Sequence, residues 1–494
     1  MALIQIKNLT FSYDGSAHNV FEGASFAMDT DWRLGLIGRN GRGKTTLLRL
    51  LCGGLLYSGT ITSPVPFTYF PFPVSDETKN TLELLEEIAP GAERWEIECE
   101  LSKLQVEENV LCRPFSTLSM GERTKALLCA LFLRPGHFLL IDEPTNHLDV
   151  RAREVVGDYL RSKKGFILVS HDRVLLDRCV DHVLSINRGT IEAMQGNFSS
   201  WQREKQRRDE LEKRHNEALK KEIKRLEEAA ARAGDWSQKT EKSKKGRGAK
   251  NSGLRPDRGF VGHKAAKMMK RSKTIETRSA KAAQEKSRLL KDVELISDLR
   301  LHPLPYPKQR LVEARNLSLF YGERRVVKGV SFTIERGDRL ALCGRNGCGK
   351  STVLKALLGE AIDRQGELLL GTNIKISYVP QDASFLSGPF SVFSQQSGVD
   401  LSLFMALLRK LGFERSQFDA PLESLSGGQK KKILLAKSLC EQAHLYLWDE
   451  PLNFVDILSR IQLEELILEY RPTMVFVEHD RAFLKNVATK NVSL

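Results

Sequence analysis

Residues 38–45 read GRNGRGKT, and residues 344–351 read GRNGCGKS. Each octapeptide fits the pattern GxxxxGK[ST] and follows an apolar run, RLGLI before the first and RLALC before the second. A glycine-rich turn between a buried strand and a helix lets backbone N–H groups surround phosphates, and the helix N-terminus adds positive potential. The two octapeptides therefore predict two phosphate-binding loops, named below the first and the second phosphate loop.

Both ends of the chain repeat further motifs in the same order. LSMGE (118–122) corresponds to LSGGQ (425–429), LLIDEP (139–144) to LYLWDEP (445–451), and SHD (170–172) to EHD (478–480). Corresponding residues are 306 to 308 positions apart, which is too constant for chance matches. Apolar runs such as GFILVS and TMVFVE alternate with helical stretches, as in a largely parallel sheet. We predict two tandem α/β domains of the P-loop type, at 1–198 and 309–494.

The two loops supply the residues expected to bind ATP and Mg²⁺. Lys44 and Lys350 are expected to contact the β- and γ-phosphates, and the hydroxyls of Thr45 and Ser351 to ligate Mg²⁺. The ATP-binding residues predicted in the loops are Gly38, Arg39, Asn40, Gly41, Arg42, Gly43, Lys44, Thr45 and Thr46, and in the second copy Gly344, Arg345, Asn346, Gly347, Cys348, Gly349, Lys350, Ser351 and Thr352.

An Asp-Glu pair ends an apolar strand in each copy. Asp142 and Asp449 are placed to hold Mg²⁺ through water. Glu143 and Glu450 follow them and are placed to polarise an attacking water as general bases. An acidic pair at a strand end can also cap a helix or lie in a solvated turn, but the preceding phosphate loops favour catalysis.

The motifs LSMGE and LSGGQ resemble the signature of ATP-binding-cassette (ABC) domains, present here twice. In that family two cassettes pair head to tail, and the signature of one covers ATP on the phosphate loop of the other. The resemblance implies a monomer with an intramolecular cassette dimer and two ATP sites. Site one would combine Lys44, Thr45, Asp142, Glu143 and His171 with Ser426, Gly427 and Gly428, and site two Lys350, Ser351, Asp449, Glu450 and His479 with Ser119 and Gly121.

The resemblance also assigns an aromatic residue and a glutamine to each site. Tyr13 and Tyr321 match the aromatic that stacks on adenine, although both can also be ordinary strand residues. YVPQ (378–381) supplies Gln381, which in this family contacts Mg²⁺ and the attacking water, whereas YFPF (69–72) has Phe72 there. Site two in turn is covered by LSMGE in place of LSGGQ. We expect both sites to bind ATP, at least one to hydrolyse it, and the rates to differ.

The net charge of the chain, +14, is confined to its middle. Residues 201–300 hold 30 Lys and Arg against 16 Asp and Glu, so their excess equals that of the whole chain. Residues 201–232 contain no Gly or Pro and predict a helix about 48 Å long. A second helical run at about 263–300 has apolar residues at a seven-residue step, which predicts an antiparallel hairpin linker (199–308). Two independent charged helices are the alternative.

The tip of this hairpin is expected at about 233–262, which includes GDWSQKTEKSKKGRGAKNSG (234–253). Segments of this composition are often solvated linkers. Confinement of the positive charge favours a polyanion partner, and base stacking on Trp236 is one expected contact, with a hydrophobic clasp in the tip as the alternative. The predicted RNA-binding residues are Trp236, Lys244, Lys245, Arg247, Lys250, Arg255 and Arg258.

DEPTNHLD (142–149), GNFSSW (196–201) and the long linker resemble the ABC-F family. The resemblance implies a protein that enters the tRNA exit site of the 70S ribosome, with the linker reaching 23S rRNA at the peptidyl-transferase centre. From lysine to signature serine there are 75 residues in the first copy and 76 in the second, which leaves no room for an arm insertion. The long tip and DEPLN (449–453) resemble the members that protect against lincosamides, pleuromutilins and streptogramin A.

Two other functions stay open: an ABC-F translation factor without a role in resistance, and a transporter ATPase with a membrane partner. No transmembrane helix is expected, because the longest stretch without charge is interrupted by Gly and Pro. The first residues read as a strand and not as a leader. Eight cysteines without a CxxC pair predict reduced thiols in a cytoplasmic protein.

Overall fold

The computed structural model describes residues 2–13, 19–74, 76–145, 148, 150–187, 190–245, 270, 301–345, 347–413, 415–453 and 455–494. The chain divides into two units, one made of Met1–Trp201 with Ile296–Leu494 and the other of Gln202–Leu295. Both cassettes therefore belong to one unit, and the segment between them forms the other.

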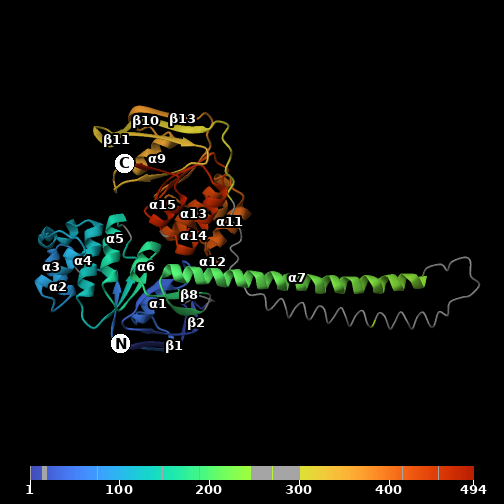
Figure 1. The fold of residues 1–494 in the computed structure, drawn as a ribbon, viewed down its shortest axis with the longest axis horizontal. Helices are drawn as coiled ribbons and strands as arrows, with labels where there is room; N and C mark the ends of the chain where they lie inside the picture. The colour runs from blue at the N-terminus through green and yellow to red at the C-terminus, as the bar shows by residue number, and fades with distance from the viewer. Residues whose placement is uncertain are drawn as a thin grey trace, which may run out of the picture. The chain divides into compact units, whose positions relative to one another are not determined.

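The first cassette combines an antiparallel sheet with a mostly parallel one (Figure 1). Its strands are β1 (Leu3–Phe11), β2 (Phe21–Asp29), β3 (Arg33–Ile37), β4 (Ser58–Thr62), β5 (Phe67–Phe70), β6 (Phe138–Asp142), β7 (Phe166–Val169), β8 (His182–Ile186) and β9 (Ile191–Gln195). Its helices are α1 (Lys44–Leu51), α2 (Thr81–Ile88), α3 (Arg94–Lys103), α4 (Met120–Phe132), α5 (Val150–Arg161) and α6 (Arg173–Cys179), with 3₁₀ turns at Glu108–Cys112 and Phe115–Thr117.

The second cassette repeats this plan. Its strands are β10 (Arg310–Tyr321), β11 (Arg324–Glu335), β12 (Arg339–Cys343), β13 (Asp363–Leu370), β14 (Ile376–Val379), β15 (Leu445–Asp449), β16 (Met474–Val477) and β17 (Lys490–Ser493). Its helices are α9 (Lys350–Leu358), α10 (Phe390–Gln396), α11 (Leu401–Lys410), α12 (Arg415–Phe418), α13 (Gly427–Cys440), α14 (Ile457–Tyr470) and α15 (Arg481–Val487), with a 3₁₀ turn at Leu422–Ser424. The predicted fold class of two tandem α/β cassettes is confirmed.

Sheet topology brings the functional motifs of each cassette to one edge. The large sheets have the orders β5-β6-β7-β3-β8-β9 and β14-β15-β16-β12-β17, and in each the four strands that carry motifs are parallel. The phosphate loops follow β3 and β12, the Asp-Glu pairs end β6 and β15, and the histidine motifs follow β7 and β16. Because carboxyl ends of parallel strands share one edge, these segments converge there.

The strands that carry the motifs are buried on both faces. β6 and β7 are apolar and buried up to Ile141 and Val169, and β15 and β16 repeat this pattern. Strands covered on both faces read as continuous apolar runs and not as alternating ones. The motif segments therefore follow strands that are anchored in the core.

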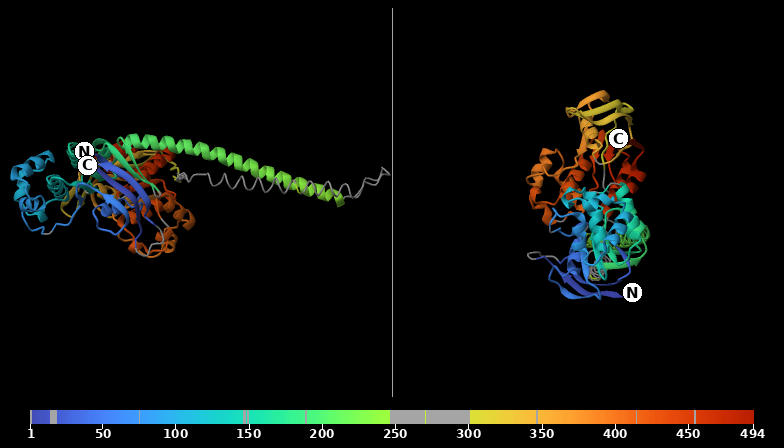
Figure 2. Two further views of the ribbon diagram at one scale, coloured as in Figure 1. Left: turned by 90° about the horizontal axis from the view of Figure 1, so that it is seen from below. Right: turned by 90° about the vertical axis from the view of Figure 1, so that its left-hand side faces the viewer.

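The segment between the cassettes begins with α7 (Phe198–Lys245), a single helix of 48 residues with a gentle curve (Figure 2). Phe198 and Trp201 at its start are buried in the hydrophobic core of the first cassette. The helix is longer than the sequence pattern predicts, because it ends at Lys245 and not near residue 232. The predicted start of the tip, near residue 233, is therefore wrong, and Trp236 lies in helical backbone. The second run of the predicted hairpin lies outside the described residues, apart from Lys270.

Candidate nucleotide sites

Each phosphate loop turns into its helix at a glycine in the left-handed region. Gly43 precedes α1 with φ of 86°, and Gly349 precedes α9 with φ of 97°. A Cβ at Gly43 would lie 2.6 Å from Val20 Cγ1, and one at Gly349 would lie 2.5 Å from Val327 Cγ2. Backbone conformation and space both require glycine at these two positions.

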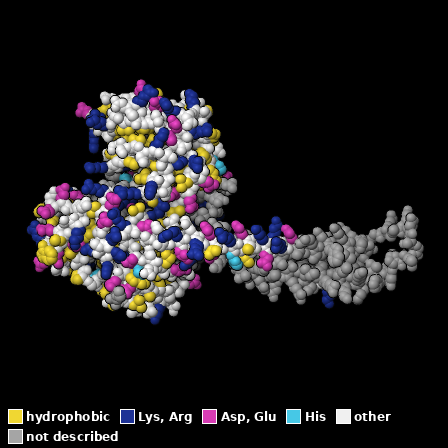
Figure 3. Space-filling model, in the orientation of Figure 1, with side chains coloured by type: hydrophobic (Ala, Val, Ile, Leu, Met, Phe, Trp, Pro, Cys, Tyr) yellow, Lys and Arg dark blue, Asp and Glu magenta, His cyan; other side chains and the backbone are white. Residues whose placement is uncertain are grey.

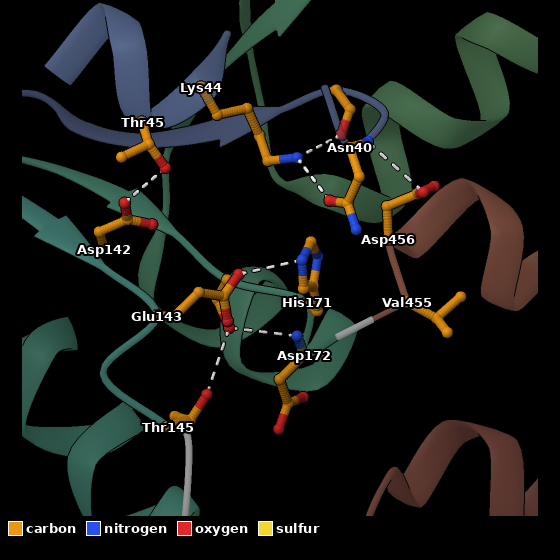
Figure 4. Close-up of polar contacts among 12 residues, drawn as sticks. Asn40, Lys44, Thr45, Asp142, Glu143, Thr145, His171, Asp172, Val455 and Asp456 are labelled. Carbon is orange, nitrogen blue, oxygen red and sulfur yellow. Dashed lines mark hydrogen bonds and ion pairs between the residues drawn. The ribbon is translucent and has the colours of Figure 1, made fainter. Parts of the chain in front are cut away.

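The lysine of each phosphate loop folds back over its own loop. Lys44 Nζ donates to Gly38 O at 2.8 Å, to Arg39 O at 3.3 Å and to Asn40 Oδ1 at 3.2 Å (Figure 4). Lys350 Nζ likewise donates to two carbonyl oxygens of the second loop, both at 3.0 Å. The ammonium group is thus held at the concave side of the loop, where a phosphate group would bind.

A hydroxyl and a carboxylate meet beside each loop. Thr45 Oγ1 donates to Asp142 Oδ2 at 2.8 Å (Figure 4). Ser351 forms the equivalent hydrogen bond with Asp449. Asp449 Oδ1 is buried without a hydrogen-bond partner among the described residues. Oxygen donors of this kind, few in number, suit Mg²⁺, which binds through one or two protein ligands together with substrate phosphates. The residues present therefore fit the magnesium ion that the sequence predicts.

The two glutamates that follow have strained backbones. Glu143 has φ of 51° and Glu450 has φ of 46°, in the left-handed region that side chains seldom adopt. His171 Nε2 lies 3.3 Å from Glu143 Oε1, and His479 Nε2 lies 3.6 Å from Glu450 Oε1. Strain of this kind persists only where the surroundings enforce it, and it concentrates at functional sites.

The two glutamates differ in electrostatic surroundings. Burial, and after it the charge of Asp142, raises the pKa of Glu143 to about 7. Burial also acts on Glu450, but side-chain hydrogen bonds with His479, Asn453 and Gln381 outweigh it and lower the pKa of Glu450. The residue that matches Gln381 in the first cassette is Phe72, which packs against the hydrophobic core. One cause of the difference is therefore the missing glutamine.

Residues of both cassettes line one cavity of about 400 Å³. The lining residues are Tyr13, Asn40, Gly41, Gly43, Lys44, Thr45, Thr46, Asp142, Glu143, Val169 and His171 of the first cassette, with Gly412, Phe413, Gln417, Ser426, Gly428, Gln429 and Lys432 of the second. The cavity therefore lies between the first phosphate loop with its Asp-Glu pair and Ser426 and Gly428 of the second signature. A volume of this size is in the range of small-ligand sites.

The signature residue Ser119, predicted for site two, caps a helix of the first cassette. The Ser119 hydroxyl caps α4 through a reciprocal pair of hydrogen bonds with Glu122. Among the described contacts, none joins Ser119 or Gly121 to the second phosphate loop. Ser426 caps α13 with Gln429 in the same way, yet Ser426 lines the cavity of site one. Residues of both cassettes thus line site one, and Ser426 of the second signature is among them.

The two predicted adenine-stacking tyrosines are partly exposed. Tyr13 is 45% exposed, and its hydroxyl lies 2.8 Å from Thr46 Oγ1. Tyr321 ends β10 and is 51% exposed. Exposure of both rings is compatible with stacking on a nucleotide base.

Polar contacts cross between the cassettes next to site one. Arg173 Nη2 lies 2.7 Å from Glu464 Oε2, and Arg460 Nη1 donates to His171 O at 3.0 Å. The backbone N–H of Asn40 donates to Asp456 Oδ2 at 3.5 Å (Figure 4). The second cassette therefore contacts both the first phosphate loop and the histidine motif.

Sequence reasoning missed three residues of this region. Asp456 is fully buried and lies 3.3 Å from Lys432 Nζ, and Tyr69 OH donates to Asp142 Oδ2 at 3.0 Å. Lys432 follows the second signature by three residues, and Asp456 ends DEPLNFVD, so the motifs themselves pointed to both. Tyr69 carries no such signal, because its contact depends on how β5 pairs with β6.

Several predicted residues lie beyond what the structure describes. Asn346 of the second phosphate loop is one of them, as are the predicted RNA contacts Arg247, Lys250, Arg255 and Arg258. Trp236, Lys244 and Lys245 are placed only by the backbone of α7.

No helix in the described part of the chain combines the length and the apolar content that crossing a membrane requires.

The model of the ABC transporter family matches residues 21–146 and 327–453, and a second model of the same description matches 184–249. The chain is 30% identical to the ATP-binding protein Uup of Caulobacter vibrioides, over 97% of this chain and 75% of Uup. It is 29% identical to the ribosome protection protein VmlR of Bacillus subtilis, over 97% of this chain and 85% of VmlR. It is 28% identical to the energy-dependent translational throttle protein EttA of Haemophilus influenzae, over 92% of this chain and 86% of EttA.

Solved structures show the same fold. The archaeal ribosome recycling factor aABCE1, in its complex with the ribosomal stalk protein aP1, matches with a TM-score of 0.61 at 20% identity, over 98% of this chain and 87% of that one. An RNase-L inhibitor matches with the same TM-score and identity, over 99% of this chain and 87% of the inhibitor. With two phosphate loops, two signatures and relatives that align along nearly its whole length, the chain is an ATPase with two ABC domains and belongs to the ABC-F family.

Proposed function

We propose that this protein binds the ribosome in the cytoplasm, enters the tRNA exit site and protects the peptidyl-transferase centre from antibiotics, and that ATP hydrolysis releases it. The observation that carries the proposal is the confinement of the excess positive charge to residues 201–300, which include most of a 48-residue helix. A long basic helix suits a deep site lined by RNA.

The described part of α7 presents a basic face. Arginine and lysine side chains alternate with acidic ones along it (Figure 3). At 100° per residue, five exposed basic residues share one side of the helix over about 33 Å. They are Arg203, Arg207, Arg214, Lys221 and Arg225. This face can neutralise phosphates of 23S rRNA or tRNA, with affinity that falls as salt rises.

The tip of the linker would make the specific contacts. Structured RNA is recognised through shape, phosphates and stacking on exposed bases, so Trp236 and the basic residues Lys244, Lys245, Arg247, Lys250, Arg255 and Arg258 are the proposed contacts. Lincosamides, pleuromutilins and streptogramin A are the proposed drugs. The tip would reshape the drug site or the bound tRNA so that drug dissociates.

The nucleotide sites would control entry and release. Lys44 and Lys350 would hold the β- and γ-phosphates, and Mg²⁺, when bound, would neutralise their charge through Thr45 and Asp142 or through Ser351, Asp449 and Gln381. Glu143 and Glu450 would accept the proton of the attacking water, with His171 and His479 beside them. ATP would hold the cassettes closed on the ribosome, and hydrolysis would let them part.

Two relatives bear on this proposal, one named for ribosome protection and the other for control of translation. VmlR is named a ribosome protection protein, and this chain covers 85% of it. EttA is named a translational throttle protein, and it is almost equally similar. The similarity to EttA favours a second candidate function, regulation of elongation without drug resistance.

The test of ribosome binding uses the Glu143→Gln, Glu450→Gln double variant, which should bind ATP and not release it. Cell extract is sedimented through a sucrose cushion with ATP and, as control, without it. We expect ATP-dependent co-sedimentation with 70S ribosomes. If the variant stays in the supernatant, or fractionates with membranes, ribosome binding is contradicted.

The test of protection replaces residues 246–262 with a short Gly-Ser turn. ATPase activity should persist, while resistance to lincosamides, pleuromutilins and streptogramin A should be lost. Full resistance in cells that express this variant would contradict the role of the tip. A deletion strain that translates poorly without drug, with unchanged inhibitory concentrations, would favour elongation control.

A further inference from the structure

A tyrosine hydroxyl contacts the candidate magnesium carboxylate of site one. Tyr69 lies in β5, and its hydroxyl donates to Asp142 Oδ2 at 3.0 Å. The same oxygen accepts from Thr45 Oγ1 at 2.8 Å. Pairing of β5 with β6 sets Tyr69 opposite Leu140, two residues before the carboxylate. The hydroxyl therefore reaches Asp142 from the neighbouring strand, while Thr45 reaches it from the phosphate loop.

The second cassette has a tyrosine in the same register without this contact. Tyr378 lies opposite Leu447 in β14, as Tyr69 lies opposite Leu140. Among the described contacts, no hydrogen bond joins the Tyr378 hydroxyl to Asp449, whose Oδ1 has no partner. Among the described residues, this hydrogen bond is therefore present at site one and not at site two.

Site one is also the site without the family's glutamine. Gln381 hydrogen-bonds Glu450 in the second cassette, whereas Phe72 packs edge to face against Phe70 with centroids 6.3 Å apart. The segment after β5 therefore offers no polar side chain at that position. Tyr69, three residues earlier, is the polar group that the same segment directs toward the acidic pair.

We propose that Tyr69 is a positioning residue of site one, whose hydroxyl holds the Asp142 carboxylate in the orientation that magnesium–ATP requires and so offsets the missing glutamine. The inference goes beyond the ribosomal function and rests on the assignment of Asp142 to Mg²⁺.

The chemistry of the pair supports this role. A tyrosine hydroxyl is protonated at neutral pH, so at 3.0 Å from Asp142 Oδ2 it donates to the carboxylate. Hydrogen bonds to charged groups are among the stronger ones in proteins. Their loss typically corresponds to a change of about tenfold in an equilibrium constant. The ring of Tyr69 packs beside the core of the first cassette, so Tyr69→Phe keeps the packing and removes only the hydroxyl.

The test measures how binding of a fluorescent ATP analogue depends on free Mg²⁺. Site one is observed alone in the Glu143→Gln, Lys350→Ala background, and site two alone in the Glu450→Gln, Lys44→Ala background. We expect Tyr69→Phe to raise the half-saturating Mg²⁺ concentration of site one about three- to tenfold. The matched control, Tyr378→Phe at site two, should change it less than about twofold. Melting temperatures verify that each variant folds.

Two outcomes overturn the inference: Tyr69→Phe without a shift, or equal shifts for Tyr69→Phe and Tyr378→Phe. Asp142→Asn at site one separates this failure from failure of the assignment beneath it. If Asp142→Asn shifts the Mg²⁺ dependence and Tyr69→Phe does not, only the role of Tyr69 is wrong. If Asp142→Asn leaves it unchanged, the assignment of Asp142 to Mg²⁺ is wrong, and the role of Tyr69 with it.

Discussion

Glu143 and Glu450 hold equivalent positions, each in a left-handed backbone after a buried strand, but their side chains have different neighbours. Gln381 and Asn453 hydrogen-bond Glu450, and the residue equivalent to Gln381 is Phe72. Hydrogen bonds to the ionised form orient a carboxylate and keep it deprotonated, while they also make it a weaker base. At the scale of single residues, the two sites are therefore unequal.

The first prediction follows from this inequality. Glu143→Gln and Glu450→Gln should each abolish hydrolysis at one site, by a factor of about 10²–10⁴. Glu143→Gln should leave the larger remaining rate, because site two keeps the hydrogen bond between Gln381 and Glu450. Steady-state phosphate release from the two single variants measures this. Equal remaining hydrolysis rates in the two single variants would show that Gln381 does not make site two faster than site one.

A second prediction concerns Glu100, a buried carboxylate on α3. Burial raises its pKa, but hydrogen bonds from Lys103, Lys163 and Tyr159 outweigh this effect and lower it from 4.5 to about 2. The folded state therefore binds the proton less tightly than the unfolded state does. The resulting stability is present above pH 4.5 and is lost as pH falls toward 2. Glu100→Gln should lower the free energy of unfolding by about 2–3 kcal/mol at pH 7.

Urea unfolding of the wild type and Glu100→Gln at several pH values measures this difference. It should shrink between pH 4.5 and 2. Glu98→Gln is the matched control, because Glu98 lies on the same helix in an exposed pair with Arg94. Exposed pairs contribute about 0–1 kcal/mol. A difference for Glu100→Gln that does not depend on pH would contradict the role of its charge.

At this scale the sequence predicts much of the chemistry. Sequence motifs identify the loop lysines, the Asp-Glu pairs and the histidines. In the structure, those of site one line one cavity. Tyr69 could not be predicted, since only the register between β5 and β6 brings its hydroxyl to Asp142. Nor could the raised pKa of Glu143, which depends on burial in three dimensions.

Among the elements, α9 shows how local sequence shapes a site. It runs between two left-handed glycines, Gly349 before Lys350 and Gly359 after Leu358. Gly349 sits against Val327, whereas a Cβ at Gly359 would meet nothing within 4 Å. Alanine at Gly359 would introduce only backbone strain, whereas alanine at Gly349 would add a steric clash.

The third prediction compares alanine at these two glycines. Gly359→Ala should cost about 1 kcal/mol of stability, from backbone strain alone, and leave ATP binding intact. Gly349→Ala should cost about 3 kcal/mol or more and abolish binding at site two, because the methyl group also collides with Val327. Thermal melting and binding of a fluorescent ATP analogue measure both effects. If both variants lost similar stability and ATP binding, the clash with Val327 would make no measurable contribution.

The linker helix marks the limit of prediction for elements. Absence of Gly and Pro predicts a helix over 201–232, but α7 continues through Gly234 and Asp235 to Lys245. A glycine inside a helix costs about 1 kcal/mol relative to alanine. Long helices tolerate such a cost, since elongation is cooperative once a helix has nucleated. The glycine was therefore a poor signal for the end of the helix.

For the molecule as a whole, the unit that contains both cassettes has polar contacts in which at least one partner lies outside the motifs. Arg173 at the start of α6 and Glu464 in α14 form a buried pair at 2.7 Å, and Asp480 lies 3.8 Å from the same guanidinium. Arg460 of α14 donates to the carbonyl of His171. The family resemblance predicts that the two cassettes pair. It does not predict which side chains form the contacts between them.

The last prediction tests this pair by a double-mutant cycle. Arg173→Met leaves Glu464 buried without its charge partner, which should cost about 3–5 kcal/mol. Glu464→Leu should be similarly costly, because Arg173 is then uncompensated apart from Asp480. Combining the two removes both charges, so the double variant should be more stable than the sum of the single losses by about 1–3 kcal/mol. ATPase activity of site one, measured with Glu450→Gln, should follow the same order, since α6 begins directly after the histidine motif. Additive losses would show that the two charges act independently and that this pair does not couple the cassettes.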